Sequence, residues 1–209
     1  MLKNGLVAIA LNQRLTRGSK LLRLAGLAQL QALPLPPYTA QRRDHSLELL
    51  ETLHTKIEQL DAAIATAAWA HPDAPHLLTH PGVGPLTALA TVVVLGPVTR
   101  FADTKHVVNY VGLAPRLNAS ADKYRLGNIT KQGSSLLRWV LGQAAPHAAR
   151  LDDHLKRAYG TLRHRRGRAK ARVAVTRKLL VRLFVMLRDH MDYAEFRRRG
   201  RPPAPVAAG

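Results

Sequence analysis

Apolar side chains recur every three or four residues from about Asp44 to Ala70, which is the spacing of one face of an α-helix. The stripe consists of Leu50, Leu53, Ile57, Leu60, Ile64 and Ala67. Its heptad repeat predicts a coiled-coil-like helix within residues 38–75. This seam packs either inside the chain or against a second copy, and its short length favours the first.

The same periodicity predicts helices on both sides of this segment. Residues 1–31 place leucines on one side and basic residues on the other, and the prolines of Leu33–Pro37 then form a linker, which closes a first segment, 1–37. Further apolar stripes lie in Leu86–Leu95, Phe101–Leu113 and Val173–His190, and Arg150–Arg163 is predicted to be a helix of mixed composition. We therefore expect a mainly α fold, with one helical domain over residues 76–193 and a disordered basic tail over 194–209.

Two single residues refine this pattern between Phe101 and Arg150. Ser134 precedes an apolar stripe and is placed to cap a helix through its hydroxyl. Pro146 lies late in the same stripe, where it is expected to kink or end that helix.

A tight turn, Pro81-Gly82-Val83-Gly84-Pro85, separates two apolar runs. Gly82 and Gly84 allow positive φ and close backbone approach, and Pro85 suits the first position of a helix. The pattern is typical of a helix-hairpin-helix-like turn, whose second helix would direct free N–H groups at a DNA phosphate. It fits a purely structural turn between two core helices equally well.

A polar segment after Arg116 carries Ser120, Lys123, Arg125 and Lys131 between apolar runs. Its glycines predict a loop or a short hairpin. A hydroxyl among cations suits a nucleophile directed at phosphate. It also suits a solvated loop, and the residues alone favour that interpretation.

Charge narrows the possible partners of the chain. Lys and Arg number 32 against 13 Asp and Glu, a net charge of +19, which predicts binding to a polyanion, nucleic acid before an anionic membrane. The densest basic run, Arg163–Arg172, includes Arg165, Arg166 and Arg168, and we expect phosphate contacts there rather than a merely solvated face.

Other site classes find little support in the sequence. The absence of cysteine excludes disulfides and Cys-based metal sites, and the histidines lack metal-ligand spacing, so no metal site is predicted. The uncharged stretch Ala74–Thr99 is interrupted by prolines and is read as core, not as a membrane span. Asp152 and Asp153 are read as a solvated helix face.

Three motifs in one order, HPGVGPLTALA, FADTKHVVNYVGLAPR and SADKYRLGNITKQGSSLLRWVL, resemble the C-terminal domain of Piv/MooV-type insertion-sequence transposases, the bridge-RNA-guided recombinases. The resemblance covers Leu77 to about Ala145, with weaker similarity to Tyr193. It implies that Ser120 is a nucleophile that attacks DNA and that Arg116, Lys123, Arg125 and Lys131 hold the phosphate. The family usually shows Ser-Ser-Gly-Gly-Lys where this chain has Ala119-Ser120-Ala121-Asp122-Lys123.

The resemblance also sets the expected partners and cofactors. It implies DNA and a guide RNA as partners, and a homo-oligomer formed through residues 46–70. The family's metal-binding acids lie in a RuvC-like domain before the coiled coil, but this chain has no Asp or Glu before Asp44. We therefore expect a truncated copy with no cofactor of its own, Mg²⁺ belonging to the missing acidic domain.

We thus predict a DNA-binding transposase in the bacterial cytoplasm, associated with the nucleoid, that binds DNA but neither cuts nor joins it alone. One alternative is a non-catalytic nucleic-acid-binding module, either a regulator or a decayed remnant. A third interpretation is a structural helix-hairpin-helix protein unrelated to recombination.

Overall fold

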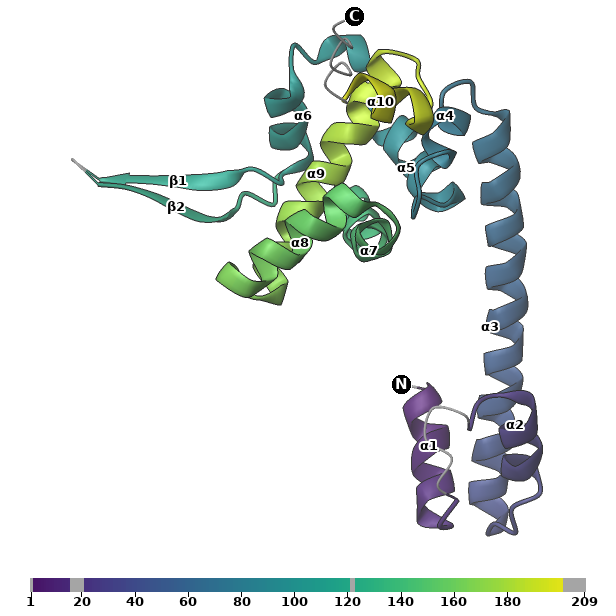
Figure 1. Cartoon of the computed structure of the whole chain (residues 1–209). Helices are drawn as coiled ribbons and strands as arrows, with labels where there is room; N and C mark the ends of the chain where they lie inside the picture. The colour runs from purple at the N-terminus through teal and green to yellow at the C-terminus, as the bar shows by residue number, and fades with distance from the viewer. Residues whose placement is uncertain (1, 16–20, 121–122, 201–209) are drawn as a thin grey trace, which may run out of the picture. The chain divides into compact units, whose positions relative to one another are not determined.

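The computed structural model describes residues 2–15, 21–120 and 123–200, with the backbone alone for Leu24 and for the strand residues among 117–126. The chain is mainly α-helical, as predicted, and the described residues form one two-stranded sheet (Figure 1). It divides into two compact units, Met1–Ala62 and Ala63–Gly209. This division falls within a long helix, whereas the sequence favours boundaries after residues 37 and 75.

Unit 1 holds two short helices, α1 (Leu2–Asn12) and α2 (Leu24–Gln31), and most of a long one, α3 (Pro37–Ala70). The prediction of one helix over residues 1–31 is wrong. Arg14 takes a left-handed φ of +58°, and the N–H of Leu15 donates back to the carbonyl of Ala10 over 2.9 Å. This hydrogen bond is typical of a helix C-terminus, so α1 ends at Asn12.

Helix α3 begins at Pro37, seven residues before the predicted Asp44, because proline is well suited to the first turn of a helix. Its first turns pack on a small core that includes Leu6 and Leu30. Arg43 is nearly buried there, and one of its nitrogens donates to the carbonyls of Leu30, Gln31 and Leu33. Arg43 thereby satisfies carbonyls at the C-terminal end of α2.

The apolar seam of α3 is only partly packed among the described residues: Leu50 lies against the small core of unit 1, but the middle of the seam is exposed. Leu53, Ile57 and Leu60 are 44%, 56% and 62% exposed. Exposed leucine and isoleucine side chains one turn apart form a helix face without a described partner.

Unit 2 contains the end of α3 and all the remaining described elements (Figure 1). They are α4 (Ala74–Leu78), α5 (Pro85–Leu95), η2 (Val98–Arg100), α6 (Thr104–Val111), β1 (Pro115–Ser120), β2 (Lys123–Ile129), α7 (Ser135–Leu151), α8 (Asp153–Arg166), α9 (Arg168–Arg188) and α10 (Tyr193–Arg199). The predicted helix Leu86–Leu95 is confirmed as α5, and the segment Ala74–Thr99 contributes Leu77, Ala88 and Leu95 to the core. No helix among the described residues is both long and apolar enough to cross a bilayer.

Helix α9 lies at the centre of unit 2, in contact with α4, α6, α7, α8 and η2. Its predicted buried positions are confirmed, because Val175, Leu179, Leu180, Leu183, Phe184 and Leu187 are all in the core. It begins at Arg168, five residues earlier than predicted, so the basic run enters this helix.

Pro146 does not end α7, which continues to Leu151. A proline has no N–H for the carbonyl four residues earlier, here that of Gly142. Arg172 of α9 supplies the missing donor, since its Nε lies 3.0 Å from the Gly142 oxygen. Ser134 caps the other end of α7 as predicted, accepting from the N–H of Leu137 over 3.2 Å.

Two further predictions need correction. The helix expected over Arg150–Arg163 is interrupted at Asp152, whose backbone is extended and whose carboxylate caps α8 through the N–H of Leu155 at 2.6 Å. The tail expected to be disordered is helical through Arg199, since Asp192 caps α10 in the same way. Residues 201–209 lie outside the described part of the chain.

Candidate nucleic-acid interface

The polar segment after Arg116 folds as an antiparallel hairpin that extends from the helices of unit 2 (Figure 1). Its backbone register pairs Ser120 with Lys123 and Asn118 with Arg125. Ser120 is therefore the last residue of β1, beside the turn, and Lys123 is opposite it. The side chains of Ser120, Lys123 and Arg125 lie outside the described part of the structure.

Two glycines permit close backbone contact where this hairpin meets the helices. Gly112 ends α6 with φ +75°, and a Cβ there would lie 1.8 Å from the carbonyl oxygen of Gln132. Gly133, with φ +88°, would place a Cβ 2.0 Å from the carbonyl oxygen of Tyr110. Only glycine fits at both positions, so the segments before β1 and after β2 are held side by side.

Arginines from the helices fasten the same backbone. Arg138 of α7 donates to the carbonyls of Val111, Gln132 and Gly133 over 3.0–3.1 Å. Arg177 of α9 donates twice to the carbonyl of Leu113, at 3.1 and 2.7 Å. We call these segments, residues 111–116 and 129–133, the hairpin base.

Two predicted phosphate-binding residues lie in the hairpin base. Arg116 is exposed and donates to the carbonyl of Thr130 at 3.3 Å. Lys131 is exposed with φ +58°, and its backbone N–H donates to Gly112. The hairpin base thus brings these two cations together in the fold, and their role stays a prediction.

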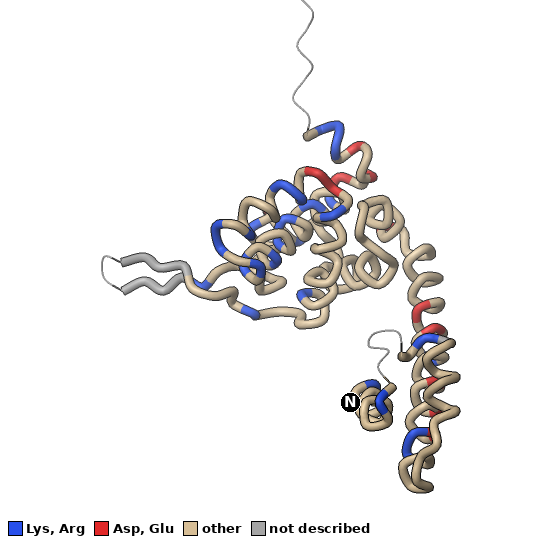
Figure 2. The backbone as a smooth tube through the Cα atoms, turned by 60° about the horizontal axis from the view of Figure 1, so that its bottom comes forward, with Lys and Arg blue, Asp and Glu red and all other residues tan. Residues whose placement is uncertain are grey.

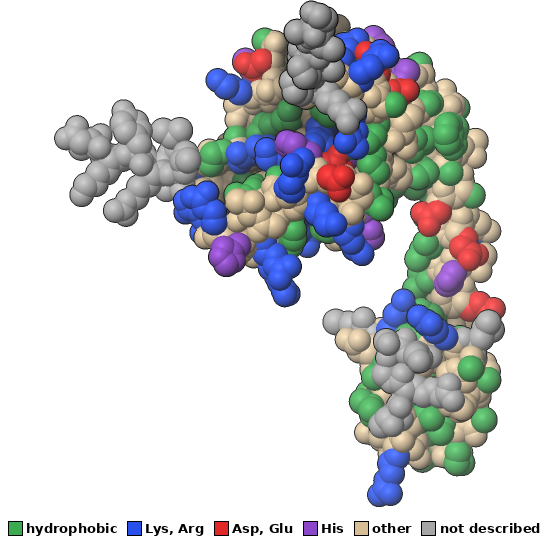
Figure 3. Space-filling view, viewed as in Figure 1, with side chains coloured by type: hydrophobic (Ala, Val, Ile, Leu, Met, Phe, Trp, Pro, Cys, Tyr) green, Lys and Arg blue, Asp and Glu red, His purple; other side chains and the backbone are tan. Residues whose placement is uncertain are grey.

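The junction of α8 and α9 forms a second basic region. Gly167, with φ +82°, joins the two helices directly, and Arg165, Arg166 and Arg168 around it are exposed. Figure 2 shows Lys and Arg positions along the backbone of these helices, and Figure 3 shows basic side chains on their surface. Within the described chain these three arginines have no acidic partner, so their charge is available to a ligand.

The turn Pro81–Pro85 joins α4 to α5 and has two different sides. Gly82 has φ +84°, and a Cβ there would lie 2.4 Å from the backbone nitrogen of Ala148 in α7, so this glycine faces the protein interior. Gly84 is exposed with open space around its Cα and immediately precedes α5. A phosphate contact at either glycine stays a prediction.

The prediction that Asp152 is solvated is wrong, because its side chain is only 3% exposed. Its carboxylate accepts from Arg182 at 2.8 Å and from the hydroxyl of Tyr193. Burial raises its pKa, but these hydrogen bonds outweigh burial and hold the pKa well below its usual range. Burial also raises the pKa of Tyr193, and its bond to Asp152 adds to that shift. The group fastens α10 to α8 and α9.

His80 packs against the ring of Tyr193, with 4.6 Å between the ring centres. Its Nδ1 is 3.0 Å from the carbonyl oxygen of Pro81, and its buried Nε2 has no partner among the described atoms. Burial lowers its pKa to about 4. His80 is therefore a neutral core residue at neutral pH.

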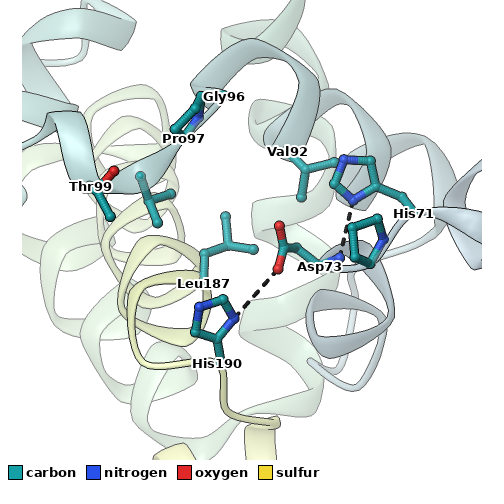
Figure 4. Close-up of a pocket in the computed structure, with 10 residues that line it drawn as sticks. His71, Asp73, Val92, Gly96, Pro97, Thr99, Leu187 and His190 are labelled. Carbon is teal, nitrogen blue, oxygen red and sulfur yellow. Dashed lines mark hydrogen bonds and ion pairs between the residues drawn. The ribbon is translucent and has the colours of Figure 1, made fainter.

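A cavity of about 440 Å³ lies beside α5 and the end of α9 (Figure 4). His190 forms an ion pair with Asp73 at 3.5 Å, and His71 accepts from the backbone N–H of Asp73. These contacts join the start of α4 to the end of α9. No group of three or more metal-ligating side chains occurs in the described part of the chain.

Two arginines that hold the hairpin base, Arg138 and Arg177, are not predicted from the sequence. Arg138 stands alone among apolar residues and Arg177 is followed only by Lys178, and their carbonyl partners lie up to 64 residues away. An arginine between apolar helix residues is the sequence pattern that indicates such a structural role.

Comparison with known proteins finds similarity to insertion-sequence proteins over part of the chain. The model of the Transposase IS116/IS110/IS902 family matches residues 74–161, from α4 through most of α8. The chain is 31% identical over 146 residues to the insertion element IS110 uncharacterized 43.6 kDa protein of Streptomyces coelicolor, covering 69% of this chain and 36% of that protein. It is 29% identical to the transposase for insertion sequence element IS1111A of Coxiella burnetii, covering 69% and 43%.

A third relative, a probable family 20 transposase of Pseudomonas aeruginosa, is 30% identical over 52% of this chain and 32% of its own length. The chain thus spans between about a third and two fifths of these curated relatives. The matched residues include the hairpin, its base and the turn before α5.

Proposed function

We propose that this chain, whose residues 74–161 match the model of the Transposase IS116/IS110/IS902 family, binds DNA during transposition of an insertion sequence. Its distribution of charge carries the proposal. Of the 32 Lys and Arg, 24 follow Ala62, against eight Asp and Glu there. Several of these cations, including Arg165, Arg166 and Arg168, are exposed without an acidic partner among the described residues.

The salt dependence of duplex DNA binding tests this proposal. With about six phosphate contacts, affinity should fall roughly 10³-fold between 50 and 200 mM salt. Replacing Arg165, Arg166 and Arg168 together by Ala should reduce the slope of log affinity against log salt by about 2–3. A slope near zero for the wild-type chain would refute DNA binding through phosphates.

A matched triple variant separates local contacts from net charge. Replacing Arg197, Arg198 and Arg199 by Ala removes the same charge, but Arg198 and Arg199 already pair with Glu195. We expect this triple to change the slope less. Equal effects of both triples would show that binding follows net charge alone.

We propose in addition that Ser120 is the nucleophile of a strand-transfer step. Its Oγ would bond to a DNA phosphorus while one bridging P–O bond breaks, the hydroxyl proton passing to a base and the leaving oxygen taking up a proton. Arg116 and Lys131, with Lys123 and Arg125, would stabilise the phosphate charge. The described residues form no carboxylate set suited to Mg²⁺, so no step is assigned to that metal.

The support for Ser120 is its position at the hairpin turn opposite Lys123, within a transposase domain. We expect no covalent adduct when the chain alone meets supercoiled DNA or a suicide substrate. An adduct should form when the family's acidic domain, Mg²⁺ and a guide RNA are added, and Ser120→Ala should abolish it. Ser135→Ala, in the first turn of α7, is the control that should retain the adduct.

Two other results would change this proposal. An adduct that persists in Ser120→Ala would exclude Ser120 as the nucleophile. No adduct under any condition, together with salt-dependent DNA binding, would identify a non-catalytic nucleic-acid-binding module. The guide RNA partner and the nucleoid-associated cytoplasmic location belong to the same proposal and rest on the family resemblance.

A further inference from the structure

A cavity of about 420 Å³ opens between the hairpin base, α7 and α9. Its apolar wall includes Leu113, Ile129, Trp139 and Val173. This volume lies in the lower range of cavities that hold small organic ligands. The buried Gly142 contributes no side chain, so it leaves space in the α7 wall.

The polar wall of this cavity is cationic. Lys131, Arg138 and Arg172 line it, and no Asp or Glu does. Arg138 and Arg172 donate to backbone carbonyls, which fix their guanidinium groups without neutralising their charge. The ammonium group of Lys131 has no partner among the described atoms. The cavity therefore favours an anionic ligand.

Trp139 gives the cavity an aromatic surface. It is 57% exposed, although a tryptophan in a helix bundle usually lies in the core. Gly142 follows it at i+3, on the same side of α7, next to the cationic wall. An aromatic ring beside fixed cations is the arrangement that binds single strands, because any base stacks on the ring while cations contact the phosphates.

From this arrangement we propose that the cavity binds one unpaired nucleotide of single-stranded DNA, its base stacked on Trp139 and its phosphate at Lys131. The inference rests on the proposed DNA-binding function and adds a preference for unpaired bases. A paired base is stacked inside the duplex, where Trp139 cannot reach its face. The cationic wall favours this ligand over an apolar protein segment.

The chain has two tryptophans, so each can be observed alone by fluorescence. The Trp69→Phe variant leaves Trp139, and Trp139→Phe leaves Trp69, which is also exposed at 65% and is the matched control. Titration with a mixed-sequence oligodeoxynucleotide should quench the fluorescence of Trp139 and not that of Trp69. The blunt duplex of the same sequence, at equal phosphate concentration, should quench Trp139 much less.

Affinity measurements give a second test that does not depend on quenching. Trp139→Ala should weaken single-strand binding about tenfold, as expected for loss of one stacked base, and leave duplex affinity unchanged. Circular dichroism should show an intact fold, since Trp139 is largely exposed.

The outcomes separate this inference from the proposed function. Equal quenching of both tryptophans, or equal loss of duplex and single-strand affinity in Trp139→Ala, would overturn the inference while duplex binding stands. Stronger quenching by an oligoribonucleotide of the same sequence would overturn the assignment to DNA. Failure of the wild-type chain to bind any DNA would overturn both.

Discussion

Single arginines in this chain serve the fold as well as its charge. Arg43, Arg138, Arg172 and Arg177 all donate to backbone carbonyls. Burial lowers the pKa of Arg177, yet an arginine pKa starts so far above neutral that the side chain stays charged. Such residues add to the net charge without all being free to contact phosphate, so composition alone overstates the number of DNA contacts.

The first prediction at this scale concerns Gly112. Gly112→Ala should destabilise the chain by at least about 1–3 kcal/mol, because a left-handed conformation is unfavourable for alanine and its Cβ would clash with Gln132. Urea denaturation measures the change. Gly160→Ala is the control: Gly160 lies within α8 with open space around it, so alanine should stabilise by up to about 1 kcal/mol. Equal changes in the free energy of unfolding for the two variants would contradict the close contact of Gly112 with Gln132 in the hairpin base.

The second prediction concerns His80. Its folded pKa of about 4 lies below the ordinary 6.5, so the unfolded chain binds a proton that the folded chain does not. The free energy of unfolding should therefore fall by about 3 kcal/mol as pH drops from 6.5 to 4. The lowered pKa of Asp152 acts in the same direction, but only below its ordinary 3.8.

Denaturation curves at several pH values test this assignment. His80→Gln should flatten the dependence between pH 6.5 and 4, since glutamine does not titrate. His54→Gln, at an exposed site on α3, should leave the wild-type dependence. An unchanged slope in His80→Gln would show that another group controls acid stability.

At the scale of elements, the exposed seam of α3 predicts self-association. If the chain forms a homo-oligomer through residues 46–70, Ile57→Asp should produce a monomer with unchanged helix content, because a charge would enter the seam. Sedimentation velocity and circular dichroism measure both properties. Gln59→Asp adds the same charge outside the seam and should leave the oligomer intact. Unfolding by Ile57→Asp would instead indicate that the seam is internal core.

The sequence predicts elements well where a single periodic stripe decides the fold. The stripe of α9 identifies its buried residues correctly, and Pro85 correctly starts α5. Prediction from the sequence fails where contacts with residues far along the chain determine the local structure. From the sequence Asp152 is predicted to be solvated, because its partners Arg182 and Tyr193 lie 30 and 41 residues away. Helix α7 continues past Pro146 because Arg172 on α9 donates to the Gly142 carbonyl, which the proline cannot do.

At the scale of the whole molecule, charge is unequally divided. The residues from Ala63 onward carry a net +16 and the rest +3. Repulsion within the basic unit should destabilise it at low ionic strength. Raising NaCl from about 10 mM to 150 mM shortens the Debye length from ~30 to ~8 Å and should therefore raise the melting temperature.

Scanning calorimetry across this salt range tests the effect. A short DNA duplex at low salt should raise the melting temperature further, because it binds the folded chain. An isomolar uncharged osmolyte controls for general solvent effects. A melting temperature independent of salt would show that the cations are far enough apart not to repel one another.

The way the hairpin base is held has a consequence for exchanging the hairpin itself. Its contacts run through main-chain carbonyls and glycines, and these do not depend on which side chains the strands carry. The stability of the hairpin base should therefore depend on Gly112, Gly133, Arg138 and Arg177 more than on the side chains of the strands. Grafting the corresponding strands of a relative between residues 116 and 127 should give a folded chimera with the recipient's stability. The hairpin would then be a part that can be exchanged without redesign of the helices that hold it.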